Sequence, residues 1–117
     1  MPTKDEMNAL IATKINTANY TWTWCDGGTT KYNDTEVKGW KIVKNATSVT
    51  LFLPAAGLRG DAGLTSDGSS GDYWSSSLVT DPDRPYGASV LNLYFEAASI
   101  GGNFRCYGIP VRPVFAE

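Results

Sequence analysis

The 117-residue sequence contains no histidine. Histidine is the side chain that proteins most often use as a general base and as a transition-metal ligand near neutral pH. Its absence excludes the Ser-His-Asp and Cys-His arrangements of hydrolytic enzymes. Carboxylates are scattered through turn-rich segments without the ligand spacing of a helix-loop-helix calcium site, so a structural calcium is the less favoured alternative. We therefore expect no catalytic residue, no metal and no cofactor.

An excess of positive charge is also lacking. Ten lysine and arginine residues stand against twelve acidic residues, which gives a net charge of −2. Because no basic stripe runs along the chain, nothing favours nucleic acid or an anionic membrane surface as a partner. The longest apolar run, Val49–Ala56, is too short to cross a bilayer. The opening segment "MPTKDEMNAL" lacks the charged and apolar regions of a signal peptide, so none is predicted.

Cysteine is scarce, with Cys25 and Cys106 as the only two. The composition does not decide between one disulfide and two free thiols. Over a reactive pair, two small apolar residues are favoured. An enzyme that used the pair would need an activating partner that the sequence does not offer, so no enzymatic activity is expected. The chain is 42% hydrophobic and 19% charged, which is typical of a globular protein, and its length predicts one domain over residues 1–117.

The clearest local signal is a helix start. Thr3 and Glu6 have the spacing of a capping box, in which each side chain satisfies a backbone N–H of the other residue. The apolar residues that follow recur at helical spacing and predict a helix over residues 4–15 that docks by one face. That face comprises Met7, Leu10, Ile11 and Ile15.

Short strands are predicted along the rest of the chain. The aromatic–threonine alternation of 20–24 is typical of a half-buried strand, and the turn-rich segment 25–36 follows it. Further strands are predicted at 37–43, 49–53, 72–77, 89–95 and 111–115. The segment 54–71 is rich in glycine and has almost no periodicity, which predicts a long packed loop. Pro113 predicts that the last strand lies at an edge.

Four segments stand out by their combination and order. They are "MPTKDEMNALI" (1–11), "LFLPAAG" (51–57), "GDYWSSS" (71–77) and "YGIPVRPV" (107–114). With them the chain resembles the Fibrobacter succinogenes major paralogous domain of gut Bacteroidetes, and the variable proteins of diversity-generating retroelements. The resemblance implies an α+β, C-type lectin-like fold with one or two helices, short antiparallel strands and long ordered loops.

The resemblance also implies a site. In the diversified members, variable residues lie just before the final strand. They arise from adenine mutagenesis of template Asn codons, which reaches Phe, Ser, Tyr, Cys, Ile, Gly, Ala, Asn and Arg but not Lys, Glu, Gln, Met or Trp. Every residue of "ASIGGNFRCYGI", residues 98–109, belongs to the reachable set. The candidate ligand-binding residues are Ser99, Ile100, Gly102, Asn103, Phe104, Cys106 and Tyr107.

On this basis we expect a non-enzymatic receptor-binding module. Its partner is a macromolecular surface ligand, either protein or glycan, and its location is extracytoplasmic or on a virion surface, such as a phage tail tip. Phe104 and Tyr107 supply the aromatic area on which such contacts depend. The loop motifs of calcium-dependent sugar-binding lectins do not occur. The alternative function is a structural or adhesive domain of a bacterial cell-surface protein without a variable surface.

The same residues also fit an ordinary antiparallel hairpin. In that interpretation Gly101 and Gly102 form the turn, and Phe104 and Tyr107 pack inward. The sequence departs from the family pattern in two places. No strand precedes the helix, which predicts either an exposed last strand with a route to self-association, or a chain that is one part of a longer protein. Pro110 stands where related sequences often carry Ser or Arg.

Overall fold

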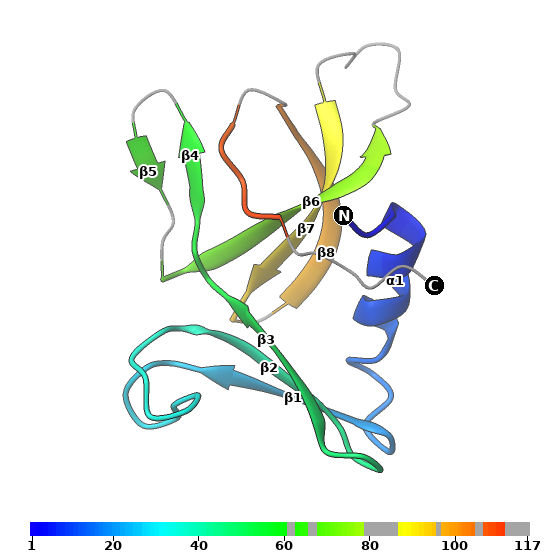
Figure 1. Cartoon of the computed structure of the whole chain (residues 1–117), viewed down its shortest axis with the longest axis vertical. Coiled ribbons are helices and arrows are strands. Elements are labelled where there is room, and N and C mark those ends of the chain that lie inside the picture. Colours follow the sequence, from blue (N-terminus) through cyan, green and yellow to red (C-terminus); the bar gives the residue numbers. More distant parts are fainter. Residues whose placement is uncertain (61–62, 66–67, 79–86, 96, 105–106, 112–117) are drawn as a thin grey trace.

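The computed structural model describes residues 1–60, 63–65, 68–78, 87–95, 97–104 and 107–111. Within these ranges one helix, α1 (Lys4–Ala12), precedes eight strands. The strands form two three-stranded antiparallel sheets, β1-β2-β3 and β6-β7-β8, and one hairpin, β4-β5 (Figure 1). Their bounds are β1 (Tyr20–Cys25), β2 (Gly39–Lys44), β3 (Val49–Pro54), β4 (Leu58–Gly60), β5 (Gly63–Thr65), β6 (Ser70–Leu78), β7 (Gly87–Tyr94) and β8 (Ala97–Phe104).

The helix begins as the capping box predicts. The Thr3 hydroxyl accepts a hydrogen bond from the Glu6 amide at 3.1 Å, and the Glu6 carboxylate accepts one from the Thr3 amide at 3.3 Å. Met7 is buried, which confirms the docking face. The helix ends at Ala12, however, and Ile15 is 86% exposed, so the predicted extension to residue 15 is wrong. Thr13 ends the helix by bonding back to the Leu10 carbonyl through its own amide and hydroxyl.

The first sheet is built around tryptophan. On its inner face Trp22 and Trp24 of β1 both pack edge-on against Trp40 of β2, with ring centroids 5.5 Å apart in each pair. Edge-to-face packing suits aromatic rings because it brings the positive edge of one to the negative face of the other. Trp24, Trp40 and Leu53 occupy one cross-strand row, so their alternation places them on one face.

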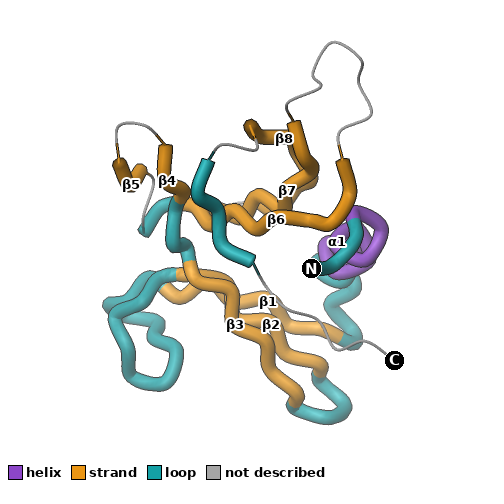
Figure 2. The backbone as a smooth tube through the Cα atoms, turned by 45° about the horizontal axis from the view of Figure 1, so that its top comes forward, coloured by secondary structure: helices purple, strands orange, loops and turns teal. Residues whose placement is uncertain are grey.

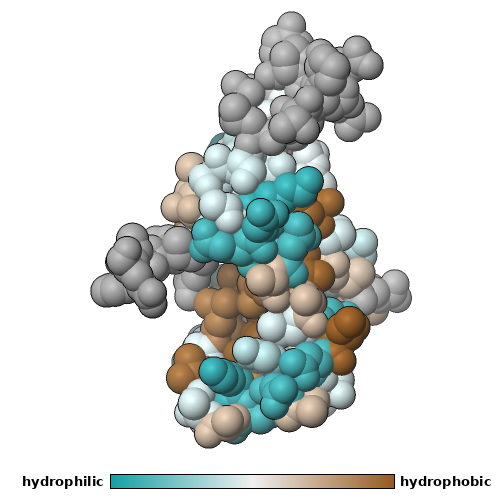
Figure 3. Space-filling view, turned by 90° about the vertical axis from the view of Figure 1, so that its right-hand side faces the viewer, coloured by the Kyte–Doolittle hydropathy of each residue, from teal (hydrophilic) through white to brown (hydrophobic). Residues whose placement is uncertain are grey.

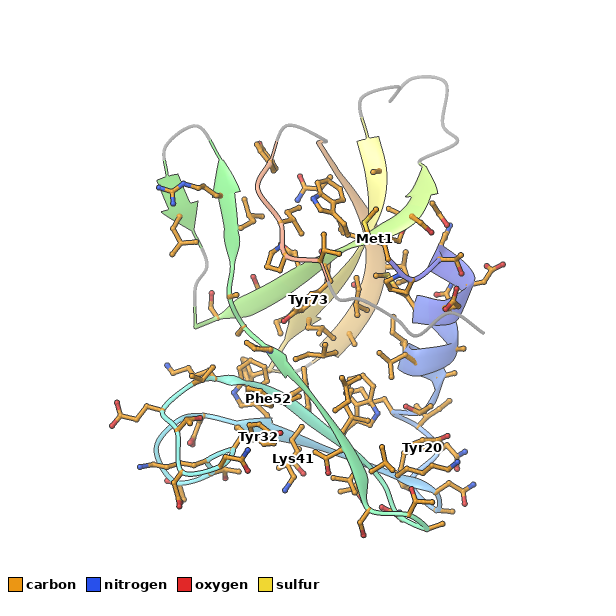
Figure 4. All side chains as sticks on the ribbon, viewed as in Figure 1. Met1, Tyr20, Tyr32, Lys41, Phe52 and Tyr73 are labelled. Atoms are coloured by element: carbon orange, nitrogen blue, oxygen red, sulfur yellow. The ribbon has the colours of Figure 1, made fainter. Side chains whose placement is uncertain are left out.

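The loop after β1 covers part of the opposite face of this sheet. The Tyr32 ring stacks on Phe52 of β3 with centroids 4.3 Å apart, and Figure 4 shows the two side chains together near Lys41. Strand alternation puts Cys25 on the same face as Phe52, and Cys25 is completely buried. The Asp26 carboxylate accepts hydrogen bonds from the Gly28 and Thr30 amides, which fixes the start of the loop.

The hydrophobic core lies where the two sheets and α1 meet (Figure 2). Its buried residues come from all three, and they are Met7, Trp40, Ile42, Leu53, Tyr73, Leu91 and Leu93. Two hydrogen bonds join the sheets directly. The Trp40 indole donates to the Tyr94 carbonyl at 2.9 Å, and the Tyr73 hydroxyl donates to the Pro54 carbonyl at 2.7 Å. Tyr73 accordingly lies between the sheets in Figure 4.

Segments outside the sheets tie distant parts of the chain together. Residues 108–110 run between β4 and β6, because Arg59 and Gly108 exchange two backbone hydrogen bonds and the Trp74 amide donates to the Pro110 carbonyl. The N-terminal residues dock on the end of β6. There the Ser76 amide donates to the Pro2 carbonyl at 2.8 Å.

The predicted fold class is wrong. The described chain is mostly β, with three antiparallel sheets and a single nine-residue helix, and not an α+β, C-type lectin-like fold with long ordered loops. Two local causes account for the difference. Thr13 stops the helix early, and the predicted loop 54–71 instead contains β4, β5 and the first residues of β6. The five strands predicted between residues 20 and 95 are confirmed with small shifts of their ends.

The surface that carries α1 mixes hydrophilic and hydrophobic side chains (Figure 3). In the described residues, no helix has the length and apolar character needed to span a membrane. The predicted strand 111–115, with its predicted role in self-association, lies outside the described residues except for Val111.

Candidate ligand-binding face

Most of the predicted site residues fall on one strand. Ser99, Ile100, Gly102 and Asn103 lie within β8, and Phe104 is its last residue. The Gly101–Gly102 turn is a wrong prediction, because Gly101 pairs with Val90 of β7 in the middle of the ladder. β7 instead ends at Tyr94, which pairs with Ala97 at the start of β8.

Alternation along β8 separates the predicted residues. Ile100 pairs with Leu91 and, like Ala98, packs against the core. Ser99 and Asn103 point to the opposite side, which we call the distal face of the second sheet. Ser99 is exposed and Asn103 is half-buried. The strand therefore brings Ser99 and Asn103 to one face and removes Ile100 from it.

The remaining candidates lie near the end of β8. Gly102 is exposed and belongs to the core-side register with Ile100. Tyr107 is half-buried beside β4, where its ring carbons lie 3.5 and 3.7 Å from the position that a Cβ on Gly60 would take. Cys106 lies outside the described residues, so its predicted contact role stays a prediction.

A row of three polar residues crosses the distal face. Asp72 of β6 pairs with Asn92 of β7, and Asn92 pairs with Ser99 of β8. We call these three residues the polar row. Exposure rises along it, since Asp72 is 6% exposed, Asn92 is half-buried and Ser99 is exposed. The row thus offers a carboxylate, a carboxamide and a hydroxyl in line across the sheet.

Gly101 makes room for the middle of the row. A Cβ at Gly101 would lie 2.5 Å from the Asn92 amide nitrogen, closer than real atoms approach. The Asn92 side chain therefore leans over Gly101 of β8, on the distal face and not toward the core. A glycine in a strand interior commonly marks such a close approach.

Asp72 is unusual within this row. Its carboxylate has no hydrogen-bond or ion-pair partner in the described part of the chain, and burial raises its pKa above the ordinary value. No described side-chain oxygen or nitrogen is both fully buried and unpartnered, so the carboxylate oxygens keep a narrow contact with solvent. A mostly buried carboxylate without a partner is energetically costly, and such groups gather at functional sites.

Trp74 occupies the next row on the same strand and face, opposite Val90. It is half-buried, whereas Val90 is fully buried, so the distal face is covered around Val90 and more open toward Ser99. The other three tryptophans pack against one another. Trp74 has no aromatic or cation partner among the described residues.

Comparison with known proteins adds no neighbour. No protein-family model, no curated protein and no solved structure matches this chain.

Two further properties bear on the chemistry of the chain. No group of three or more metal-ligating side chains occurs among the described residues. Cys25 is a free, buried thiol, and burial is the main cause that raises its pKa; Lys41 lowers the pKa and Asp26 raises it to a smaller extent.

Sequence reasoning missed Asp72, Trp74 and Asn92. The signal for the first two was present, because "DYW" in a predicted strand places Asp72 and Trp74 on one face and Tyr73 on the other. Asn92 interrupts the apolar run of residues 90–93 at a position that alternation assigns to the face opposite Leu91 and Leu93. What the sequence lacked was the register that aligns these residues with Ser99.

Proposed function

We propose that the chain is a non-enzymatic ligand-binding module and that its contact surface is the distal face of the second sheet. The main support is the alternation of β8, which turns Ser99 and Asn103 away from a strand face that is committed to the core. A strand with one side anchored in the core can change residues on its other side at a smaller cost to folding.

The sequence resemblance supports the same surface from another direction. Proteins diversified by retroelements vary the segment before their last strand, and the corresponding segment predicted for this chain, residues 98–109, overlaps β8. The proposal keeps Ser99 and Asn103 as contact residues, assigns Ile100 to the scaffold, and adds Asp72, Trp74 and Asn92. A macromolecular ligand suits it better than a small one, because the five contact residues come from three strands.

Natural variation tests this proposal at residue resolution. The 3′ end of the gene is amplified from many isolates, and substitutions are mapped onto β8. We expect changes to gather at the outward positions 99 and 103, at adenines of Asn-type codons, while the core-side positions 98 and 100 stay constant.

Two outcomes would contradict the proposal. Substitutions spread equally over outward and core-side positions would remove the display role of β8. A complete absence of substitutions in this segment would favour a fixed structural or adhesive domain instead. A matched control is β2, where Lys41 and Val43 face away from the core but belong to no proposed contact surface.

A further inference from the structure

The polar row carries a charge without a counterpart. Asp72 is the only charged residue within β6, β7 and β8. It is 6% exposed, and its carboxylate has no partner in the described residues. Removing a carboxylate from water without supplying a partner costs free energy, and a ligand that brings the missing positive charge recovers that cost.

The neighbour of Asp72 on the same strand face suits such a ligand. The indole of Trp74 is two residues away, is half-buried, and makes no ring or cation contact in the described part of the chain. Its nitrogen has no hydrogen-bond partner there either. Because no described side-chain nitrogen or oxygen is both fully buried and unpartnered, the indole nitrogen of Trp74 reaches solvent. The face of an indole attracts organic cations through its quadrupole.

The composition of the row distinguishes among ligands. A neutral sugar hydroxyl would leave the charge of Asp72 unmatched. Metal ions such as calcium take six or more oxygen ligands, whereas the row supplies four side-chain oxygens, of which only the two of Asp72 carry charge. A guanidinium carries five N–H donors, of which the Asp72 carboxylate can accept two at once, and Asn92 beside it on β7 offers a further acceptor oxygen.

If the chain is the ligand-binding module proposed above, these residues indicate the chemistry of the group that it binds. We propose that the polar row and Trp74 bind a guanidinium or ammonium group of a basic protein segment, with Asp72 as its charged acceptor and the Trp74 indole beside it. Solvent exposure of the row rises from Asp72 to Ser99, so the basic side chain would enter from the Ser99 side and reach toward Asp72.

The test uses the full chain and small probes of matched shape. N-acetyl-argininamide carries the guanidinium, N-acetyl-citrullinamide replaces it with a neutral urea, and methyl α-glucoside represents a glycan. Each is titrated while NMR follows the Trp74 indole N–H and the Asn92 side-chain amide. We expect saturable shifts with the arginine probe and at least tenfold weaker binding of the citrulline probe.

Two variants at the proposed site and one control variant locate the binding. Asp72→Asn keeps the shape of the side chain and should weaken the arginine probe at least tenfold. Asp26→Asn changes a carboxylate of the first sheet's loop and should leave that affinity unchanged. Trp74→Leu provides a second reading that does not depend on the charge, and it should weaken the arginine probe at least threefold.

The remaining outcomes overturn the inference. Equal binding of the arginine and citrulline probes would show that charge plays no part. Shifts at the same resonances with the glucoside alone would replace a basic ligand by a glycan and leave the proposed binding function standing. No saturable shift with any probe would remove the cation site, whereas the variation map of β8 would still decide the proposed function.

Discussion

The hydroxyl of Tyr73 in β6 donates a hydrogen bond to the carbonyl of Pro54 at the end of β3, at 2.7 Å. This bond crosses the interface between the two sheets beside the buried Leu53 and Leu91. Tyr73 is buried and Pro54 is half-buried, so the bond stabilises the fold mainly by preventing an unpaired carbonyl.

Removing only that hydroxyl measures its contribution. We expect Tyr73→Phe to lower the free energy of unfolding by about 1 kcal/mol, because the Pro54 carbonyl loses its donor. Urea unfolding followed by fluorescence gives the value. Tyr94→Phe is the matched control, since Tyr94 is 41% exposed and should change stability by less than about 0.5 kcal/mol. Equal effects of the two variants would contradict the assigned bond.

Gly71 lies where β6 passes the end of β3. A Cβ there would stand 2.5 Å from the Pro54 carbonyl oxygen and 3.3 Å from the Ala55 Cα, and both are backbone atoms that cannot swing aside. Gly71→Ala should therefore cost about 3 kcal/mol, the upper end for overpacking. At Gly28 the nearest atom to a Cβ is 3.7 Å away, so Gly28→Ala should cost under about 1 kcal/mol. Thermal unfolding of both variants compares them directly.

Asp72 makes stability depend on pH. Burial raises its pKa, so the folded protein holds this proton more tightly than the unfolded chain does. Its effect is then most favourable below the unfolded pKa, and stability is lost as pH rises through the folded pKa. Asp72→Asn should accordingly have a higher Tm than the unchanged protein at pH 7, and the difference should shrink below about pH 4. A variant that is less stable at pH 7 would show that the carboxylate has an internal partner.

Cys25 should be a slow nucleophile. Burial raises its pKa, and only the thiolate reacts readily. In a chain that carries Cys106→Ser, we expect iodoacetamide to modify the folded protein roughly 100-fold more slowly than the urea-unfolded chain. Mass spectrometry follows the reaction. Comparable rates in the two states would place the thiol at the surface.

The sequence predicted elements that depend on local chemistry. The capping box located the start of α1, and the alternation of Trp22 and Trp24 with threonine located β1, because neighbouring residues decide both signals. The end of α1 was missed because the apolar spacing continues to Ile15 while Thr13 already bonds back to the Leu10 carbonyl.

The candidate site was only partly predictable. The sequence pointed to Ser99 and Asn103, which the proposal keeps, but it assigned Gly101 and Gly102 to a turn because glycine is most common there. Both glycines lie inside the β7-β8 ladder, and the Asn92 amide that covers Gly101 comes from the neighbouring strand. Strand register is a property of the folded sheet, and it alone aligns Asp72 with Asn92 and Ser99.

The connectivity of the sheets has a consequence for the order of folding. In each sheet every strand pairs with its neighbours in sequence, so each ladder closes only short loops and can form quickly. The bonds that join Gly108 to Arg59, Pro110 to Trp74 and Pro2 to Ser76 span far longer stretches of chain. We expect these three long-range contacts to form last, after the sheets have docked. Changes at Gly108 should then mainly speed unfolding, whereas changes within the β1-β2 ladder should slow folding.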